Sequence, residues 1–228
     1  MKPAFFHLDL SEHQGELMSD AARPPRATAA RLSLYLRCLE GWLREDQQTA
    51  SSRDLASALS LGDAQVRKDL AYLGSLGRRG VGYKTANLIA AIRSALGIDR
   101  EWPVVVIGAG NLARALLRYR GFKDRGFRIV GLFDSDPRLI GQQVDGLEVL
   151  PVAALRRRVA ETNAEFGVIA VPSESAQEVA NALVKAGIRG ILNFAPALLR
   201  LPKGLAIVNV DLTIQLEQLA FQVLAGSE

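Results

Sequence analysis

The chain has 228 residues, of which 49% are hydrophobic and 23% charged, and its formal net charge is +4. This length fits one or two domains with a substantial apolar core. Because no run of 18 apolar residues and no basic-then-apolar signal peptide is present, we expect a cytoplasmic protein without a transmembrane helix. Cys38 and two histidines are too few for a disulfide or a zinc site, so no metal is expected.

Positive charge is concentrated in one segment of the chain. Residues 1–20 have a net charge of −3, residues 21–84 have +5, and residues 85–228 have +2. A basic segment beside a nearly neutral remainder is typical of a polyanion-binding domain joined to a domain of another kind. A solvated basic face has the same composition and stays open as an alternative.

The basic segment begins with a long predicted helix. Residues 1–25 show no sustained period and are expected to form a flexible tail. From Thr28 onward, apolar residues recur on one face at positions 32, 35, 36, 39 and 43, which predicts an amphipathic helix. Cys38 lies within this helix and is interpreted as a packing residue.

Two short helices are predicted next, with a glycine-containing turn between them. Ser52 is the expected N-cap of a helix at 53–59, and Asp63 is the expected N-cap of a helix at 64–73. This arrangement has the layout of a helix-turn-helix.

The second of these helices has two faces of opposite character. Val66, Leu70 and Leu73 form its apolar stripe. Polar side chains share an arc of about 100° on another side, where they could contact bases. An ordinary solvated face is the alternative, but three short helices with a basic second half fit a winged helix better. The residues on this arc are Gln65, Lys68, Asp69 and Tyr72.

A glycine-rich segment at 74–83 follows, with Arg78, Arg79 and Gly80 at its centre. Glycine lets a β-ribbon turn tightly and lets its backbone approach a phosphate, and arginine can enter a minor groove. We therefore expect a wing, because a plain linker would not need the aromatic and β-branched residues that follow the glycines. A short helix at 87–96 ends this domain.

Strand and helix patterns alternate in the second half of the chain. Such alternation is typical of a parallel, doubly wound sheet, so the predicted fold class is α/β. Ser175 and Glu178 predict a capping box at the start of one helix, and Gly187 predicts its end. The strands are expected at residues 104–107, 128–134, 166–171, 190–194 and 205–210.

The first of these strands runs into a G-x-G-x-x-A motif, which is the fingerprint of a dinucleotide-binding loop. Gly108 permits the tight turn, Gly110 lets the backbone approach a pyrophosphate at the helix N-terminus, and Ala113 allows close helix packing. Ala109, Asn111 and Leu112 complete the motif.

Asp134 ends the next predicted strand, 26 residues after Gly108. A carboxylate at this place accepts hydrogen bonds from ribose hydroxyls and repels a 2′-phosphate, which predicts NAD(H) as the ligand. The alternative is that Asp134 only begins a turn with Ser135, Asp136 and Pro137.

A catalytic group for hydride transfer is not evident in this domain. Both histidines lie within the first 13 residues. Tyr119 and Lys123 have Y-x-x-x-K spacing, but they follow the glycine loop too closely to face a nicotinamide. We therefore expect no enzyme, and a dinucleotide that acts as a signal with DNA binding as the output. An NAD-dependent oxidoreductase with an accessory basic domain, or a constitutive DNA-binding scaffold, are the alternatives.

Five segments, each weak evidence alone, occur together in a characteristic order. They are residues 65–70 (QVRKDL), 79–83 (RGVGY), 108–112 (GAGNL), 133–137 (FDSDP) and 190–196 (GILNFAP). Their order and spacing resemble the Rex family of bacterial redox-sensing transcriptional repressors over about residues 26–224. The resemblance implies a homodimer that binds an inverted-repeat operator and releases it when NADH replaces NAD⁺.

The resemblance also implies domains and site residues. A winged helix is expected at 26–98, a Rossmann NAD(H)-binding domain at 99–210 and a dimerisation helix at 211–228. DNA contacts are expected from Gln65, Arg67, Lys68, Asp69, Tyr72, Arg78, Arg79 and Gly80. Cofactor contacts are expected from Gly108, Ala109, Gly110, Asn111, Leu112, Ala113, Tyr119, Asp134, Ser135, Val171, Pro172, Asn193, Phe194, Ala195 and Pro196.

In this family, the C-terminal helix crosses to the partner subunit. Here Leu212, Leu216, Leu219 and Val223 supply an apolar stripe for that crossing, and packing on the chain's own sheet is the alternative. The resemblance further implies a redox-dependent polar link among Arg37, Tyr119 and Asp211. Leu212 stands where the family often has phenylalanine near the nicotinamide.

Overall fold

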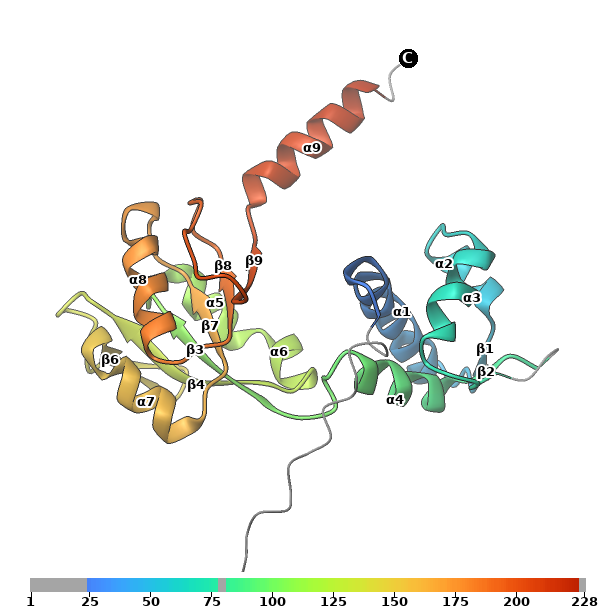
Figure 1. Cartoon of the computed structure of the whole chain (residues 1–228), viewed down its shortest axis with the longest axis horizontal. Coiled ribbons are helices and arrows are strands. Elements are labelled where there is room, and N and C mark those ends of the chain that lie inside the picture. Colours follow the sequence, from blue (N-terminus) through green and yellow to red (C-terminus); the bar gives the residue numbers. More distant parts are fainter. Residues whose placement is uncertain (1–23, 78–80, 226–228) are drawn as a thin grey trace, which may run out of the picture. The chain divides into compact units, whose positions relative to one another are not determined.

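The computed structural model describes residues 24–77 and 81–225, and it divides between Asp99 and Arg100 into two compact units (Figure 1). The predicted wing-tip residues Arg78, Arg79 and Gly80, and most of the predicted tail, lie outside the described residues. In the described ranges no helix is both long enough and apolar enough to cross a membrane. The same ranges hold no cluster of His, Cys, Asp and Glu suited to a metal ion.

The N-terminal unit is a small helical domain with a two-stranded ribbon. Its core contains the predicted apolar face of the first helix, where Leu32, Tyr35, Leu36 and Leu39 are completely buried. Val66 and Leu70 pack into the same core from the third helix, as predicted. The elements are α1 (Arg26–Arg44), β1 (Thr49–Ala50), α2 (Ser52–Ala58), α3 (Asp63–Ala71), β2 (Tyr83–Lys84) and α4 (Thr85–Ala95).

The predicted N-caps of α2 and α3 are each wrong by one residue. Ser51 caps α2, because its side chain accepts from the Asp54 amide at 3.1 Å while Asp54 accepts from the Ser51 amide at 2.8 Å. Such a reciprocal pair needs an acceptor three residues after the cap, and Ser52 has none. Asp63 is the first residue of α3, where its carboxylate pairs with Arg67 one turn later.

The end of the glycine-rich segment forms a two-stranded ribbon with β1. Tyr83 pairs with Ala50 in antiparallel register. Gly82 has a φ of +85°, and a Cβ there would lie 2.6 Å from the carbonyl oxygen of Ala50. Glycine is therefore required where this segment enters the ribbon.

The C-terminal unit is a seven-stranded sheet in the order β5-β6-β4-β3-β7-β8-β9. All pairs are parallel except β5 with β6. The five predicted strands are present with shifted ends, but the hairpin of β5 and β6 was not predicted. The strands are β3 (Trp102–Ile107), β4 (Phe127–Asp134), β5 (Gln143–Val144), β6 (Leu147–Pro151), β7 (Phe166–Ile169), β8 (Gly190–Asn193) and β9 (Ala206–Asn209).

Helices cover both faces of this sheet, so that β3 is buried on both sides (Figure 1). Val105 and Ile107 face the core beneath α7 and α8, while Val104 and Val106 face the core beneath α5. This alternation agrees with the predicted doubly wound architecture. The helices are α5 (Asn111–Arg118), α6 (Arg120–Asp124), the 3₁₀ helix η2 (Val152–Ala154), α7 (Leu155–Thr162), α8 (Ser173–Lys185) and α9 (Leu212–Ala225).

The ends of α8 confirm one prediction and correct another. Gly187 has a φ of +94° directly after the C-cap Ala186, as expected for a helix end. The helix begins earlier than predicted, after Pro172. Ser175 and Glu178 therefore lie inside α8, and the capping box predicted for them is not formed.

Candidate functional site

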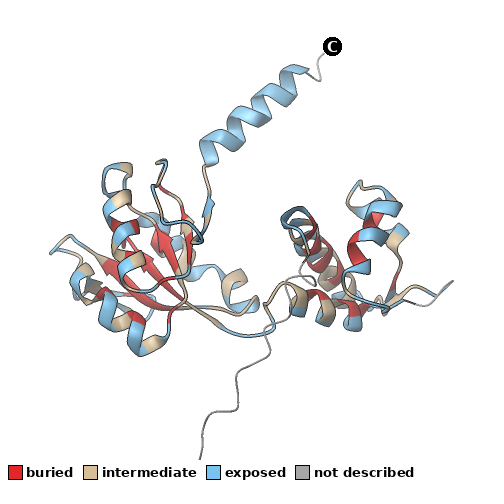
Figure 2. Cartoon of the chain, viewed as in Figure 1, coloured by how far each residue is buried: buried red, intermediate tan, exposed pale blue. Residues whose placement is uncertain are grey.

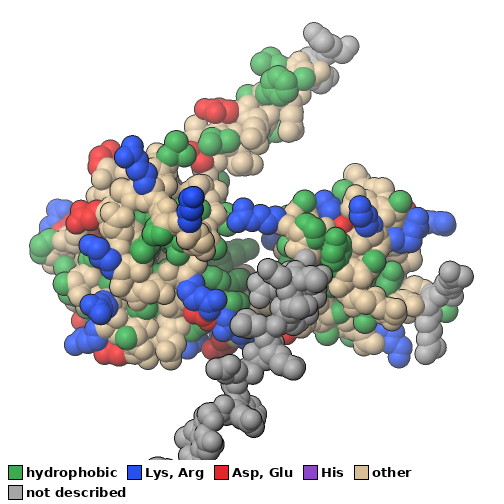
Figure 3. All heavy atoms as spheres, in the orientation of Figure 1, with side chains coloured by type: hydrophobic (Ala, Val, Ile, Leu, Met, Phe, Trp, Pro, Cys, Tyr) green, Lys and Arg blue, Asp and Glu red, His purple; other side chains and the backbone are tan. Residues whose placement is uncertain are grey.

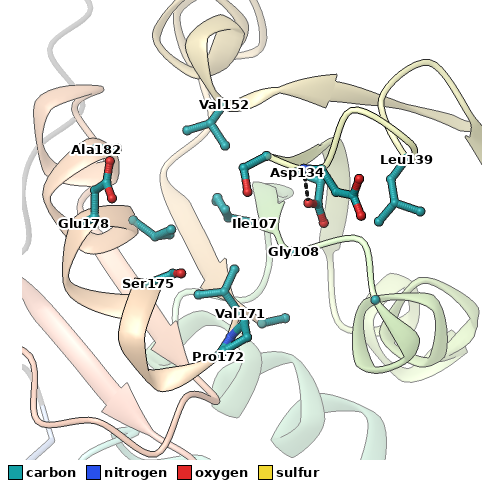
Figure 4. Close-up of a pocket in the computed structure, with 15 residues that line it drawn as sticks. Ile107, Gly108, Asp134, Leu139, Val152, Val171, Pro172, Ser175, Glu178 and Ala182 are labelled. Atoms are coloured by element: carbon teal, nitrogen blue, oxygen red, sulfur yellow. Dashed lines mark hydrogen bonds between the residues drawn. The ribbon is translucent and has the colours of Figure 1, made fainter.

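A cleft of about 350 Å³ lies at the carboxyl ends of β3, β4 and β7, beside α8 (Figure 4). The chain order of the strands reverses here, because β4 lies on one side of β3 and β7 on the other. Ligands of open parallel sheets bind at such a topological switch point. The cleft is lined by Ile107, Gly108, Gly110, Asp134, Ser135, Asp136, Leu139, Val152, Ala170, Val171, Pro172, Ser175, Glu178, Val179 and Ala182.

The glycine loop has the geometry that its motif predicts. Gly108 has a φ of +98°, and a Cβ there would lie 2.3 Å from the carbonyl oxygen of Ala170. A Cβ at Gly110 would meet open space. Ala113 is fully buried against the sheet. The loop therefore turns tightly at its first glycine and leaves room at its second, where α5 begins, for a pyrophosphate.

Asp134 lines the cleft and also holds its backbone in place. One carboxylate oxygen accepts from the Ala109 amide at 2.7 Å, and the other accepts from the Asp136 amide at 2.8 Å. The turn considered as an alternative role is thus present. Because an ionised carboxylate has about four acceptor sites, Asp134 retains capacity for ribose hydroxyls.

The lining of the cleft is acidic. Asp134, Asp136 and Glu178 contribute carboxylates, and none of the described lining residues is Lys or Arg. The bidentate pair with Arg138 lowers the pKa of Asp136, so this side chain stays ionised. A pyrophosphate here would be stabilised by the N-terminus of α5, and an added 2′-phosphate would be repelled.

The predicted cofactor residues fall into two groups. Ser135, Val171 and Pro172 line the cleft with the glycine loop.

Asn193 is 1% exposed, and its amide nitrogen donates to the carbonyls of Ala195 and Ala197 and to Asn209. Its oxygen accepts from the Ala195 amide. Its side chain ties the ends of β8 and β9 together and supports the loop that follows, and its contact with the cofactor stays a prediction.

The other predicted cofactor residues do not line the cleft. Ala195 is buried, Phe194 packs on the apolar core beneath α5, and Pro196 is exposed. Tyr119 is 57% exposed between α5 and α6, and it lines a separate depression with Lys123. Asn111, Leu112 and Ala113 belong to the first turn of α5 beside the cleft.

Several lining residues were not predicted. Leu139 and Val152 come from segments that follow β4 and β6, and Glu178, Val179 and Ala182 come from the inner side of α8. Only the period of α8 could have indicated which of its residues face the sheet.

In the N-terminal unit, a groove of about 740 Å³ lies between the start of α2, α3 and the glycine-rich segment. Arg53 and Arg67 line this groove. Gln65 and Lys68 on α3 and Tyr72 at its C-cap are exposed, as predicted for side chains that contact DNA. The helix-turn-helix layout thus leaves polar and basic side chains of α2 and α3 accessible.

Asp69, however, was wrongly predicted to face DNA. Its side chain is 1% exposed and accepts from Arg31 Nε at 2.6 Å, Arg31 Nη2 at 2.7 Å and the Tyr35 hydroxyl at 2.8 Å. Thr28 and Gln65 donate to it at 3.2 and 3.0 Å. Asp69 faces inward because α1 covers this side of α3.

This network shifts the ionisation of its members. Burial disfavours the Asp69 carboxylate, but hydrogen bonds from Arg31, Tyr35 and Gln65 outweigh burial and lower the pKa of Asp69 to about 2. Burial and the hydrogen bond to Asp69 raise the pKa of Tyr35 to about 12. Asp69 is therefore ionised and Tyr35 neutral at physiological pH.

The residues of the predicted switch lie on different elements. Arg37 is exposed on α1 in the N-terminal unit. Asp211 caps α9, because its Oδ1 accepts from the amides of Thr213 at 2.9 Å and Ile214 at 3.3 Å. In the described parts of the chain no hydrogen bond joins Tyr119 to Asp211.

Helix α9 does not pack on its own sheet, so that alternative is wrong. None of its described residues is buried (Figure 2), and its hydrophobic side chains lie on the molecular surface (Figure 3). A groove of about 420 Å³, lined almost entirely by apolar side chains, lies over β7, β8 and β9 next to Phe122 and Phe127. The predicted stripe of Leu212, Leu216, Leu219 and Val223 is 54–69% exposed.

Family comparisons agree with this architecture. Residues 25–71 match a family described as "Putative DNA-binding protein N-terminus", and residues 99–197 match a CoA binding domain. The redox-sensing transcriptional repressor Rex of Carboxydothermus hydrogenoformans is 50% identical over 199 residues, covering 87% of this chain and 96% of that protein. The chain belongs to the Rex family. The Rex repressor of Streptomyces coelicolor is 46% identical over 90% of this chain and 80% of its own length.

Solved structures of the Rex family have the same fold. RSP in complex with β-NAD⁺ and operator DNA has a TM-score of 0.84 and 33% identity, covering 90% of this chain and 94% of that chain. RSP in complex with β-NADH has a TM-score of 0.81 and 32% identity, covering 90% and 96%. These comparisons confirm the predicted family and the predicted α/β fold class. They also place this chain among regulators rather than enzymes.

Proposed function

We propose that this protein is a transcriptional repressor that binds an inverted-repeat operator and releases it when NADH binds. The single observation that supports this best is the cleft at Gly108, Gly110 and Asp134. It has the backbone geometry of a dinucleotide site, while Tyr119 and Lys123 line a different depression. The ligand is then a signal, and the repressor acts in the cytoplasm, where NADH and operator DNA are both present.

A bound dinucleotide would have its pyrophosphate held by the N-terminus of α5, beside Gly110. Asp134 accepts from the adenosine ribose hydroxyls and, with Asp136 and Glu178, disfavours a phosphorylated ribose. The apolar walls formed by Val152, Val179 and their neighbours suit an adenine ring.

The N-terminal unit supplies the DNA contacts. Helix α3 enters the major groove with Gln65 and Tyr72 on its accessible face, and Lys68 contacts phosphate. Arg67 pairs with Asp63 within the helix, and its guanidinium is exposed enough to contact a phosphate. The predicted DNA contacts of Arg78, Arg79 and Gly80 belong to the same proposal, although these three residues lie outside the described ranges.

A homodimer places two such helices on the two half-sites of an inverted repeat. The exposed apolar stripe of α9 is the surface that a second copy covers. Asp211 at the start of α9 then reaches the partner subunit, where its charge can pair with an arginine such as Arg37.

The proposal is tested by fluorescence anisotropy with a duplex that carries the operator bound by RSP. We expect tight binding in excess NAD⁺, release on addition of NADH, and no release by the same concentration of NADPH. Binding that ignores NADH would favour a constitutive DNA-binding scaffold. NADH oxidation that depends on an added substrate would favour an oxidoreductase.

A second measurement tests the coupling itself. If NADH and operator favour different dimer geometries, operator DNA must weaken NADH binding by the same factor by which NADH weakens operator binding. Calorimetric NADH titrations with and without saturating operator measure this factor. Equal affinities in the two titrations would contradict the repressor function.

A further inference from the structure

Gln65 is held at the boundary between the buried network of α3 and its accessible face. Gln65 is exposed, yet its side-chain Nε2 donates a hydrogen bond to Asp69 Oδ1 at 3.0 Å. Asp69 is itself 1% exposed and held by Arg31 and Tyr35 of α1. The amide of Gln65 is therefore bound to a carboxylate that is itself held in one orientation by Arg31 and Tyr35.

The identity of the acceptor sets the orientation of that amide. An ionised carboxylate accepts hydrogen bonds but donates none, so the nitrogen of the Gln65 amide must face Asp69. The low pKa of Asp69 keeps this carboxylate charged across the physiological range. One N–H of Gln65 is used in this way, and the second N–H and the oxygen Oε1 remain available.

If the N–H that faces Asp69 is the one trans to Oε1, the two remaining groups form one donor beside one acceptor on the same edge of the amide. In the major groove, adenine offers the complementary pair, an N6 donor next to the N7 acceptor. Guanine offers two acceptors, and cytosine and thymine each offer a single hydrogen-bonding group there. Of the four bases, adenine alone can occupy both groups of Gln65.

We propose that Asp69 is a positioning residue that orients the Gln65 amide, and that Gln65 so oriented recognises one adenine in each operator half-site. This inference rests on the proposed function as a DNA-binding repressor. It replaces the predicted direct contact of Asp69 with DNA by an indirect one. It also makes base recognition depend on α1, because Arg31 and Tyr35 fix the carboxylate.

The test is selection from a pool of inverted-repeat duplexes with randomised half-sites, using the full-length chain with NAD⁺. Wild type should enrich an A·T pair at one position of each half-site. Gln65→Met should lose that preference alone, by about 5- to 150-fold, because a bidentate contact is removed. Asp69→Asn should lose it as well, since an amide cannot accept all the hydrogen bonds that the carboxylate accepts.

Gln48→Met is the matched control. Gln48 is an exposed glutamine whose Nε2 also donates to an aspartate, Asp46 at 2.7 Å, but it lies outside α3. This variant should keep every base preference. NADH affinity should be unchanged in all variants, because the nucleotide cleft lies in the other unit.

Should Asp69→Asn fail to fold, nuclear magnetic resonance of the wild type still decides the orientation. The side-chain amide of Gln65, assigned by its absence from Gln65→Met, should show one hydrogen-bonded proton well downfield of the other. Two solvent-like protons, or an unchanged A·T preference in Gln65→Met or in folded Asp69→Asn, would overturn the inference. A wild-type chain that enriches no sequence would instead contradict the proposed function.

Discussion

The two units differ in what holds their functional groups in place. In the C-terminal unit, the cleft is shaped by backbone, through the positive φ of Gly108 and the two amides bound by Asp134. In the N-terminal unit, the recognition surface depends on side chains of α1 and α3 that meet at Asp69. A side-chain network loses several contacts when one member is removed, so we expect the N-terminal unit to be the more sensitive to single substitutions.

The largest expected effect is from Asp69→Ala. This change leaves the Arg31 guanidinium, 25% exposed, and the buried Tyr35 hydroxyl without their acceptor. Breaking such a pair by removing one partner lowers the free energy of unfolding by about 3–5 kcal/mol. Urea unfolding followed by fluorescence of Trp42, in a Trp102→Phe background, measures this effect in the N-terminal unit.

Two controls sharpen this comparison. Trp102 fluorescence in a Trp42→Phe background reports the C-terminal unit, whose stability should not change. Asp63→Ala removes an acid from the same helix, but its pair with Arg67 is partly exposed and should contribute less than about 1 kcal/mol. Equal losses for Asp63→Ala and Asp69→Ala would show that the buried network has no special role.

The next largest effect on stability is expected from Gly108→Ala, and Gly110→Ala in the same loop should behave differently. Gly108→Ala forces a Cβ to within 2.3 Å of a carbonyl oxygen at a φ of +98°, so it should lower the free energy of unfolding by about 3 kcal/mol. Gly110→Ala meets open space and should change stability by less than about 0.5 kcal/mol. Yet it should weaken NADH binding about tenfold or more, because the Cβ takes the space of the pyrophosphate. An unchanged NADH affinity in Gly110→Ala would move the ligand away from this loop.

The same contrast explains which features could be predicted from the sequence. The glycine loop follows from residue type, because only glycine tolerates the backbone conformation at position 108. The strands follow from residue type as well, because alternate apolar residues of β3 fill the cores on the two faces of the sheet. The hairpin of β5 and β6 had a usable signal in Asp145-Gly146, where both residues have positive φ.

The inward side of α3 could not be predicted in the same way. A helical period identifies the apolar stripe of Val66 and Leu70, but it does not tell which neighbour covers the polar residue beside that stripe. Asp69 is buried because Arg31, 38 residues earlier in the chain on α1, supplies a matching charge. The role of Asn193 was missed for the same reason, since its partner Asn209 lies on another strand.

Acid should lower the free energy of unfolding of the N-terminal unit through Asp69, by somewhat less than the substitutions above. The folded pKa of Asp69, about 2, lies below its ordinary value of 3.8, so its contribution is complete above about pH 4 and is lost as pH falls toward 2. At 1.36 kcal/mol per pKa unit, this amounts to about 2 kcal/mol. Urea unfolding of the Trp42 reporter from pH 5 to pH 2 measures it. In Asp69→Asn this part of the pH dependence should disappear, and its persistence would assign it to other carboxylates.

The smallest effect concerns the start of α9, where Asp211 is proposed to contact the partner subunit. Asp211 caps the helix through the amides of Thr213 and Ile214, so Asp211→Ala should lower the stability of α9 by about 1 kcal/mol. Asparagine caps a helix as well as aspartate does but has no charge, so Asp211→Asn should keep the helix and the dimer.

These two variants separate the cap from the charge. If the carboxylate acts by pairing with Arg37 of a partner subunit, both variants should reduce the factor by which operator DNA weakens NADH binding, measured by calorimetry. If Asp211 acts only by starting the helix, Asp211→Asn should keep the wild-type factor while Asp211→Ala loses it. Coupling between the units would then depend, like the nucleotide cleft itself, on backbone hydrogen bonds rather than on a side-chain ion pair.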